Sequence, residues 1–172
     1  MSLLHWWPLN GDLKDYGSES VPLINHGATI VNDGKIGKTY QFNGSNNYMS
    51  CSLPLKRLIT FTTWVKFTST GSYHVMDWRD GSGGYQPFYG GTNYGLQNYT
   101  SAGGSANWSA AECGFTANKW VHVAVVMAGT YSKLYINGAL ITQKSAGYGA
   151  DNLGTKEFRL GSRFTNANWF NG

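Results

Sequence analysis

Charged residues are scarce in this sequence of 172 residues. Lysine and arginine number 13 and the acidic residues number 9, so only 13% of the chain is charged, about half the usual share. This shortage excludes a coiled coil, and the 41% hydrophobic content excludes an intrinsically disordered chain. Nucleic-acid binding is also disfavoured, because the basic residues are scattered and Lys56-Arg57 is their only adjacent pair.

Residues that carry out chemistry are equally sparse. The four histidines are far apart and make no spacing typical of metal ligands, and the sequence has no G-x-S-x-G segment that would present a nucleophilic serine. Cys51 and Cys113 lie outside any C-x-x-C pattern. They can form a disulfide or remain two buried free thiols, and the second interpretation is favoured.

Long hydrophobic runs are missing as well. No segment approaches the roughly 18 apolar residues of a membrane-spanning helix. The N-terminal residues MSLLHWWPLNGD lack the basic start and the apolar core of a signal peptide. We therefore expect a soluble chain without membrane insertion and without an export signal of its own.

Glycine and aromatic residues, by contrast, are abundant: the chain has 23 glycines, and 15% of it is Phe, Trp or Tyr. Glycine disfavours long helices and aromatic residues favour strands. Residues 59–67 alternate with period two, residues 120–128 are apolar on both faces, and Asn137-Gly138 is a strong hairpin signal. Further strands are expected near residues 3–8, 21–31, 38–43, 47–52, 72–79 and 156–163.

These many short strands predict a single all-β domain over residues 1–172, because no internal repeat or linker divides the chain. The alternating strands favour a two-sheet antiparallel β-sandwich over a barrel, and a jelly roll is the preferred topology. The two apolar faces of residues 120–128 fit a central strand that is covered on both sides.

Residues 71–110 differ from the rest because eight aromatic residues lie there among nine glycines. Gly-rich loops often carry the binding site of a rigid sandwich, and a sugar ring is recognised by an aromatic platform beside hydrogen-bonding groups. The candidate platforms are Trp78, Tyr85, Tyr89, Tyr94, Tyr99 and Trp108. The candidate hydrogen-bonding residues are Asp77, Arg79, Asp80, Gln86, Asn98 and Asn107.

The tryptophans also have a structural interpretation. Trp78 alternates with Met76 and can equally belong to the core, whereas Trp108 lies between Asn107 and Ser109 and is expected to be exposed. The tryptophans expected to be structural are Trp6, Trp7, Trp64 and Trp120.

Four segments follow one another in the order of a known fold: LHWWPLNGDLKDYG, GKIGKTYQFNGSNNYMS, ITFTTWVKF and KWVHVAVVMAGTYSKLYINGALI. Together they resemble the concanavalin A-like lectin/glucanase superfamily, in its laminin-G-like jelly-roll branch. The resemblance implies a β-sandwich that either binds or hydrolyses glycans. It also implies a further strand after Gly172 that pairs near residues 3–8, so we expect the natural chain to continue or a partner chain to supply that strand.

Glycoside hydrolysis is the less favoured of the two activities, and we expect no enzyme. Retaining glycosidases need two carboxylates about 5–5.5 Å apart, but the three glutamates are isolated from other carboxylates. The close pairs Asp12/Asp15 and Asp77/Asp80 stand at expected turns, where aspartate commonly hydrogen-bonds its own backbone.

Calcium is the one cofactor that the resemblance suggests, since laminin-G-like domains often bind it through loop carboxylates. Asp12 and Asp15 are the candidate ligands because calcium prefers oxygen donors. Asp15 fits an ordinary Asx turn equally well.

Two functions remain. The first is a non-catalytic carbohydrate-binding or adhesion module that recognises a cell-surface glycan or polysaccharide through residues 71–110. The second is a structural or assembly domain whose aromatic loops contact partner subunits. A lectin-like domain that begins without a signal peptide resembles bacteriophage tail or virion proteins, so we expect it on a virion or another extracellular surface.

Overall fold

The fold is seen in a computed structural model, which describes residues 2–54, 56, 58–68, 71–80, 83–91, 94–100, 104–145 and 154–172. Only the backbone is described for residues 80, 83, 91, 94, 99 and 100.

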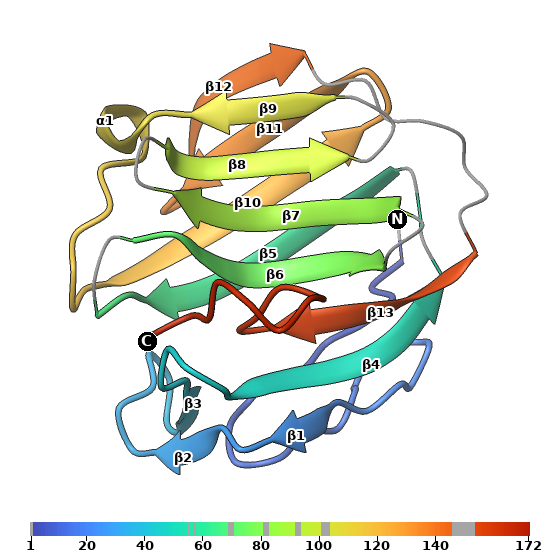
Figure 1. The fold of residues 1–172 in the computed structure, drawn as a ribbon, viewed down its shortest axis with the longest axis vertical. Coiled ribbons are helices and arrows are strands. Elements are labelled where there is room, and N and C mark those ends of the chain that lie inside the picture. Colours follow the sequence, from blue (N-terminus) through green and yellow to red (C-terminus); the bar gives the residue numbers. More distant parts are fainter. Residues whose placement is uncertain are drawn as a thin grey trace.

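Two large antiparallel sheets form the molecule, and Figure 1 shows the smaller one behind β6, β7 and β8. The seven-stranded sheet has the order β1 (Ile24–His26), β4 (Tyr48–Pro54), β13 (Thr155–Leu160), β6 (Tyr73–Asp80), β7 (Gly83–Gly91), β8 (Tyr94–Thr100) and β9 (Ser105–Trp108). The four-stranded sheet has the order β12 (Ala139–Ser145), β11 (Tyr131–Ile136), β10 (Trp120–Ala128) and β5 (Leu58–Lys66). The remaining elements are β2 (Thr29–Val31), β3 (Thr39–Gln41) and α1 (Ala110–Cys113). The predicted all-β sandwich is confirmed.

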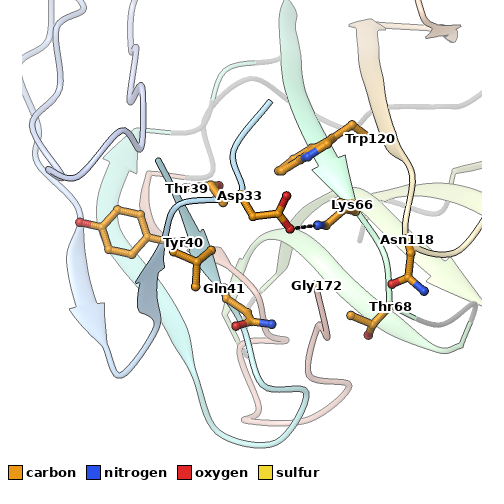
Figure 2. Close-up of a pocket in the computed structure, with 10 residues that line it drawn as sticks. Asp33, Thr39, Tyr40, Gln41, Lys66, Thr68, Asn118, Trp120 and Gly172 are labelled. Carbon is orange, nitrogen blue, oxygen red and sulfur yellow. Dashed lines mark hydrogen bonds and ion pairs between the residues drawn. The ribbon is translucent and has the colours of Figure 1, made fainter. Parts of the chain in front are cut away.

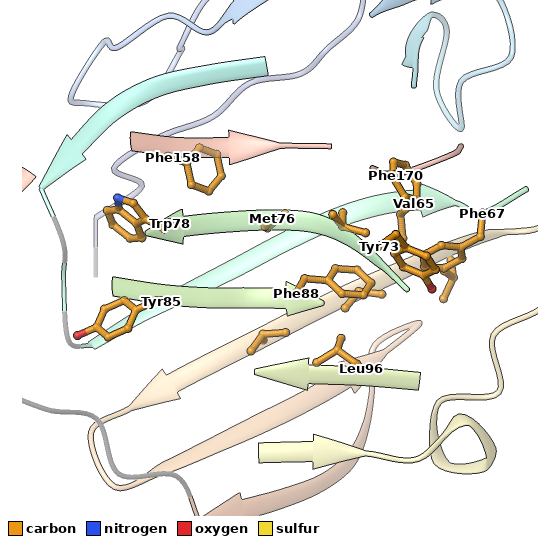
Figure 3. Close-up of a cluster of buried hydrophobic side chains, with 14 of the residues drawn as sticks. Val65, Phe67, Tyr73, Met76, Trp78, Tyr85, Phe88, Leu96, Phe158 and Phe170 are labelled. Atoms are coloured by element: carbon orange, nitrogen blue, oxygen red, sulfur yellow. The ribbon is translucent and has the colours of Figure 1, made fainter. Parts of the chain in front are cut away.

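The core lies between the two sheets and combines aliphatic side chains with many aromatic rings (Figure 3). At one end of it, the ring centroid of Phe67 lies 5.2 Å from that of Tyr73 and 5.8 Å from that of Phe170. Trp78 meets Phe158 edge-on at 6.1 Å. Each large apolar side chain fully buried here contributes roughly 1.5–3 kcal/mol to folding.

The strands with clean alternation match the sequence expectation closely. Residues 120–128 form β10 and residues 58–66 form β5, and the two pair along their whole length. The turn between β11 and β12 has positive φ at both Asn137 and Gly138, as a two-residue hairpin turn requires. Cys51 and Cys113 are both buried and free, which confirms the favoured interpretation of the cysteines.

The expected strand near residues 3–8 is absent: this part of the chain has no regular structure. It is held instead by backbone hydrogen bonds from the segment that follows it, as from Tyr16 N to Trp6 O and from Glu19 N to Leu4 O. The local composition favoured a strand, but tertiary contacts decide the conformation here.

Residues 71–110 are not a cluster of loops. They form β6, β7, β8 and β9, four adjacent strands of the larger sheet. The pairings of β6 with β7 and of β7 with β8 each contain register shifts, and such bulges break the alternation on which the sequence prediction depended.

The outer face of β10 is also unlike the expectation. Its inward residues are buried, but the alternate residues, Trp120 among them, are only half-buried. The segment of Asp33 and Lys35 reaches one end of this sheet face, through the ion pair with Lys66 and the contact of Lys35 with the Trp64 ring at 4.8 Å.

Candidate functional site

Four of the twelve predicted site residues point into the core. Trp78, Tyr85, Asn98 and Trp108 are at most 1% exposed, so the prediction of an exposed Trp108 is wrong. Along a strand, successive side chains point to opposite faces. The polar neighbours of Trp108 therefore gave no information about its own surroundings.

Five other predicted residues lie on the opposite side of the same sheet, which we call its outer face: Asp77, Arg79, Gln86, Tyr89 and Asn107. The side chains of the last three predicted residues, Asp80, Tyr94 and Tyr99, lie outside the described residues. The twelve residues predicted from the sequence therefore come from both faces of one sheet, which the sequence could not separate.

A buried polar network occupies the outer face of β6. Arg79 donates from Nε to Oδ1 of Asp77 at 3.0 Å and from Nη2 to Oδ2 at 2.6 Å. The same Nη2 lies 3.2 Å from Nε2 of His74. The ring of Phe164 lies 5.3 Å from the Arg79 guanidinium, and the His74 ring packs on Tyr89 at 4.5 Å. These contacts fix the network in one arrangement.

The protonation of this network follows from its burial. Burial lowers the pKa of His74 to about 3, and the charges of Arg79 and Arg163 act in the same direction, against a hydrogen bond to Gln86 that raises it. His74 is therefore neutral at pH 7. Burial raises the pKa of the Asp77 carboxyl, while the hydrogen bonds and charge of Arg79 oppose that rise.

A second polar group, centred on Arg159 of β13, continues the outer face. Arg159 pairs in register with Asp77 on β6, which joins the two groups. Its guanidinium donates to Oε2 of Glu157 at 2.8 Å, to Oδ1 of Asn166 at 2.7 Å and to the backbone oxygen of Arg163 at 3.1 Å. The loop of residues 161–169 is thereby tied down over the sheet.

Aromatic rings accompany Arg159. Its guanidinium lies 4.5 Å from the ring centroid of Tyr48, which stacks on His26 at 4.1 Å and lies 6.0 Å from Trp169. Tyr48, His26 and Trp169 are all half-buried. We call this combined set the outer-face cluster: His26, Tyr48, His74, Asp77, Arg79, Glu157, Arg159, Arg163, Phe164, Asn166 and Trp169.

Most residues of this cluster are not among those predicted from the sequence. A signal existed in residues 47–52 and 156–163, where polar residues alternate with core residues such as Met49 and Phe158. Those segments were identified as strands, but their polar faces were not considered as a site.

A crevice of about 290 Å³ separates β3 from the end of β5 (Figure 2). Lys66 and Asp33 form an ion pair across it, and the indole of Trp120 lies beside them. The outer-face cluster is the stronger candidate for ligand binding, because it combines aromatic rings with several hydrogen-bonding side chains on one surface.

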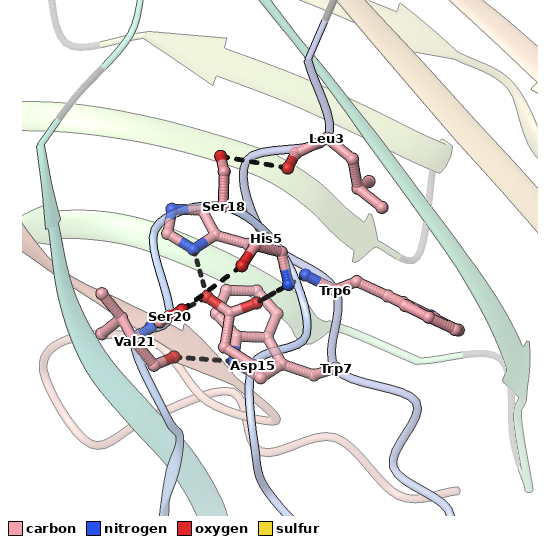
Figure 4. Close-up of polar contacts among 9 residues, drawn as sticks. Leu3, His5, Trp6, Trp7, Asp15, Ser18, Ser20 and Val21 are labelled. Atoms are coloured by element: carbon pink, nitrogen blue, oxygen red, sulfur yellow. Dashed lines mark hydrogen bonds and ion pairs between the residues drawn. The ribbon is translucent and has the colours of Figure 1, made fainter.

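The carboxylate of Asp15, the calcium candidate, is fully enclosed by donors (Figure 4). Backbone N–H groups of Trp6 and Gly17 donate to Oδ1, each at 2.8 Å, and that of Val21 donates to Oδ2 at 2.9 Å. Nδ1 of His5 lies 2.8 Å from Oδ2. N–H donors stabilise an anion and compete with a cation, so the arrangement does not fit a calcium ligand.

Asp12 does not complete such a site either. Its Oδ1 accepts from the N–H of Lys14 at 3.0 Å and its Oδ2 from the hydroxyl of Tyr16 at 3.1 Å. Among the described residues, no group of three or more His, Cys, Asp or Glu side chains is placed to hold a metal ion.

The carboxylates of the outer-face cluster are likewise occupied. Asp77 is bonded to Arg79 and Glu157 to Arg159, in each case on the same strand. An acid and base pair for glycoside hydrolysis needs carboxyl groups that are free to exchange protons with a substrate.

Comparison with known proteins places the fold. The family model described as "Concanavalin A-like lectin/glucanases superfamily" matches residues 42–172. A search of curated proteins found no match. None of the described helices is both long enough and apolar enough to span a bilayer.

Several solved structures share this architecture. Domain 4 of AbnA, a GH43 extracellular arabinanase from Geobacillus stearothermophilus in complex with arabinotriose, has a TM-score of 0.71 and 19% identity over 99% of this chain and 88% of that one. A botulinum neurotoxin type C structure, from a study of ganglioside-dependent cell entry, has a TM-score of 0.66 and 18% identity. It is matched over 93% of this chain but only 42% of its own length.

The binding domain of botulinum neurotoxin DC in complex with SialylT gives a TM-score of 0.67 at 14% identity, over 92% of this chain and 43% of that one. At such identities the structures agree in fold alone. With the family match over most of its length, the chain belongs to the concanavalin A-like lectin/glucanase superfamily, as a laminin-G-like jelly-roll domain.

Proposed function

We propose that the protein is a non-catalytic carbohydrate-binding module and that the outer-face cluster is its binding site. The observation that carries this proposal is the half-buried pair of rings, Tyr48 and Trp169, beside the hydrogen-bonding side chains of Asn166 and Glu157.

This arrangement has the two elements that sugar recognition needs. A sugar ring stacks its C–H face on an aromatic ring, and its hydroxyls need polar partners with a fixed orientation. Arg159 supplies the fixed orientation, because it bonds both Glu157 and Asn166 while its guanidinium stacks on Tyr48. The ligand therefore meets a surface that is ordered before binding, which lowers the entropic cost of association.

The comparisons support the class of ligand. The arabinanase domain is named as a complex with arabinotriose, and the neurotoxin work names gangliosides. Because these proteins share less than 20% identity with this chain, they support glycan binding in general and no particular glycan. The finer setting that we propose is recognition of surface glycans by a virion or another extracellular protein.

The test removes aromatic rings inside and outside the cluster. Trp169→Ala and Tyr48→Ala are expected to weaken binding to the best ligand of a glycan array by at least about tenfold. The first change removes a stacking surface, and the second removes the ring against which His26 and Arg159 pack. Trp6→Ala is the matched control, because Trp6 is 53% exposed but lies in the N-terminal segment, outside the cluster. The same affinity in all three variants would place the site elsewhere.

The absence of hydrolysis is tested on the same ligand. Prolonged incubation is expected to release no reducing sugar, because Asp77 and Glu157 are each held by an arginine. Sustained release of reducing ends, lost in Glu157→Gln, would identify the protein as a glycoside hydrolase instead.

An assembly role is the second candidate, and one surface favours it. The outer face of the four-stranded sheet carries Trp64 at 41% exposure, and Leu58 and Leu140 are exposed at its edges. If subunits pack here, light scattering detects an oligomer that Trp64→Arg dissociates. A monomer at all concentrations contradicts this role.

A further inference from the structure

Arg163 is the one cation of the outer-face cluster without an acidic partner. Asp77 neutralises Arg79 and Glu157 neutralises Arg159. The described residues offer the Arg163 guanidinium no hydrogen-bond acceptor, and its Nε is buried and unpaired. Arg163 as a whole is half-buried. A buried guanidinium N–H without an acceptor lowers the stability of the fold, and a ligand that supplies the acceptor removes that cost.

The position of Arg163 ties it to the proposed glycan site. Its guanidinium lies 5.5 Å from the ring of Phe164, which also packs against Arg79 at 5.3 Å. Its charge acts on both His74 and Asp77. Its backbone oxygen accepts the bond from Arg159 described above. The free guanidinium therefore belongs to the same surface as Tyr48 and Trp169.

A second unpaired atom lies close by. Nδ1 of His74 is buried and makes no hydrogen bond of normal geometry, although Gln86 lies close enough to the ring to influence its pKa. Asp77 and Glu157 are bonded to Arg79 and Arg159, so no acidic side chain among the described residues is bonded to Arg163. A buried N–H without an acceptor and an arginine without an acidic partner favour an anionic, hydrogen-bonding ligand.

We propose that Arg163 binds the carboxylate of an acidic sugar, so that the module selects acidic over neutral glycans. The inference rests on the proposed carbohydrate-binding function and adds the class of ligand to it. A guanidinium presents two parallel N–H groups that match the two oxygens of a carboxylate, whereas a neutral sugar offers only single hydroxyls. Trp169 then stacks on the ring of the same sugar or of its neighbour.

The experiment uses two pairs of matched ligands. One pair is a sialylated oligosaccharide and its desialylated form, and the other is polygalacturonate and its carboxyl-reduced form. In each pair only the acidic group is removed, so the preference for the acidic member measures carboxylate recognition. Whichever pair is bound identifies the source of the carboxylate, a sialic acid or a uronic acid.

The variants separate charge from geometry. Arg163→Gln is expected to reduce binding of the acidic ligand by at least about tenfold and to leave the neutral one unchanged. Arg163→Lys is expected to bind the acidic ligand with an affinity between those of the parent protein and Arg163→Gln. Lysine keeps the positive charge but lacks the paired N–H donors of arginine. Lys14→Gln is the control, since it removes one positive charge from an exposed position outside the cluster. Thermal melting of each variant verifies that it is folded.

The outcomes distinguish this inference from the function on which it rests. Equal binding of acidic and neutral members by the parent protein, or an unchanged preference in folded Arg163→Gln, overturns the role of Arg163 and leaves glycan binding intact. Binding of no glycan by the parent protein overturns both.

Discussion

At the scale of single residues, the carboxylate of Asp15 organises a segment that has no regular secondary structure. Burial acts to raise its pKa, but the hydrogen bonds from His5 and from three backbone N–H groups together lower it below its ordinary value of 3.8. The N-terminal strand that the composition predicted is replaced by a chain wrapped around one buried anion.

Asp15→Asn is therefore expected to destabilise the protein by about 2–4 kcal/mol, because an amide NH₂ must face N–H donors. Chemical denaturation at pH 7 measures this loss. Asp12→Asn is the matched control, since Asp12 is exposed, and we expect a much smaller effect from it.

The pH dependence gives an independent check on Asp15. A lowered pKa in the folded state means that its contribution is complete above the unfolded pKa of about 3.8 and is lost as the pH falls through the folded value. Below pH 4 the parent protein should consequently lose stability more steeply than Asp15→Asn. If the free energy of unfolding falls equally with pH in both proteins, the pKa of Asp15 is not lowered in the folded state.

Tryptophan shows how far residue-level inference can reach without a structure. Trp6 was expected to be structural and is largely exposed, whereas Trp108 was expected to be exposed and is fully buried. Neighbouring residues in the sequence describe the other face of a strand, and the burial of a side chain depends on the layer that covers it. Only the fold supplies that layer.

At the scale of elements, the clarity of alternation decided which strands could be predicted. β5 and β10 pair without a shift, and their sequence pattern was unmistakable. β7 is interrupted by bulges on both of its edges, so its residues alternate irregularly and its glycines suggested loops. The paired partners that explain the bulges are distant in the sequence and could not be inferred from it.

Gly84 is one glycine of β7 whose lack of a side chain the sheet requires. Its φ is +131°, and a Cβ added there would lie 2.2 Å from the backbone oxygen of Trp78. Gly84→Ala is expected to lower the free energy of unfolding by about 2–4 kcal/mol. The positive φ is strained for alanine, and the pairing of β6 with β7 leaves no room for the added methyl group.

Gly71→Ala is the control for that measurement. A Cβ at Gly71 would have no other atom within 4 Å, so this change should leave the free energy of unfolding unchanged or slightly increased. Equal melting temperatures for the two alanine variants would show that the pairing at Gly84 is looser than described.

At the scale of the whole molecule, the inner and outer faces of the sheets have different roles. Their inner faces share an aromatic core, and the outer face of the larger sheet carries a charged network that no core requirement explains. Asp77, Arg79 and Gln86 on that face could be predicted from residue type alone. Arg159, Arg163 and Trp169 could not, because they reach this face through the pairing of β13 with β6, strands about 80 residues apart.

His74 couples this network to global stability. Burial and the nearby arginines lower its pKa from 6.5 to about 3. Between pH 3 and pH 6.5, His74 is therefore protonated in the unfolded chain but not in the folded protein. Stability therefore rises with pH through this window and is fully present above pH 6.5. Between pH 7 and pH 5 the parent should lose about 2 kcal/mol that His74→Gln does not lose.

The measurement is denaturant unfolding of both proteins at several pH values between 5 and 7, above the ordinary pKa range of carboxyl groups. The quantity compared is the slope of the free energy of unfolding against pH. His74→Gln also loses the packing of its ring on Tyr89 and can be less stable at every pH. If His74→Gln has the same slope as the parent protein, the pKa of His74 is not lowered in the folded state and burial does not keep the ring neutral.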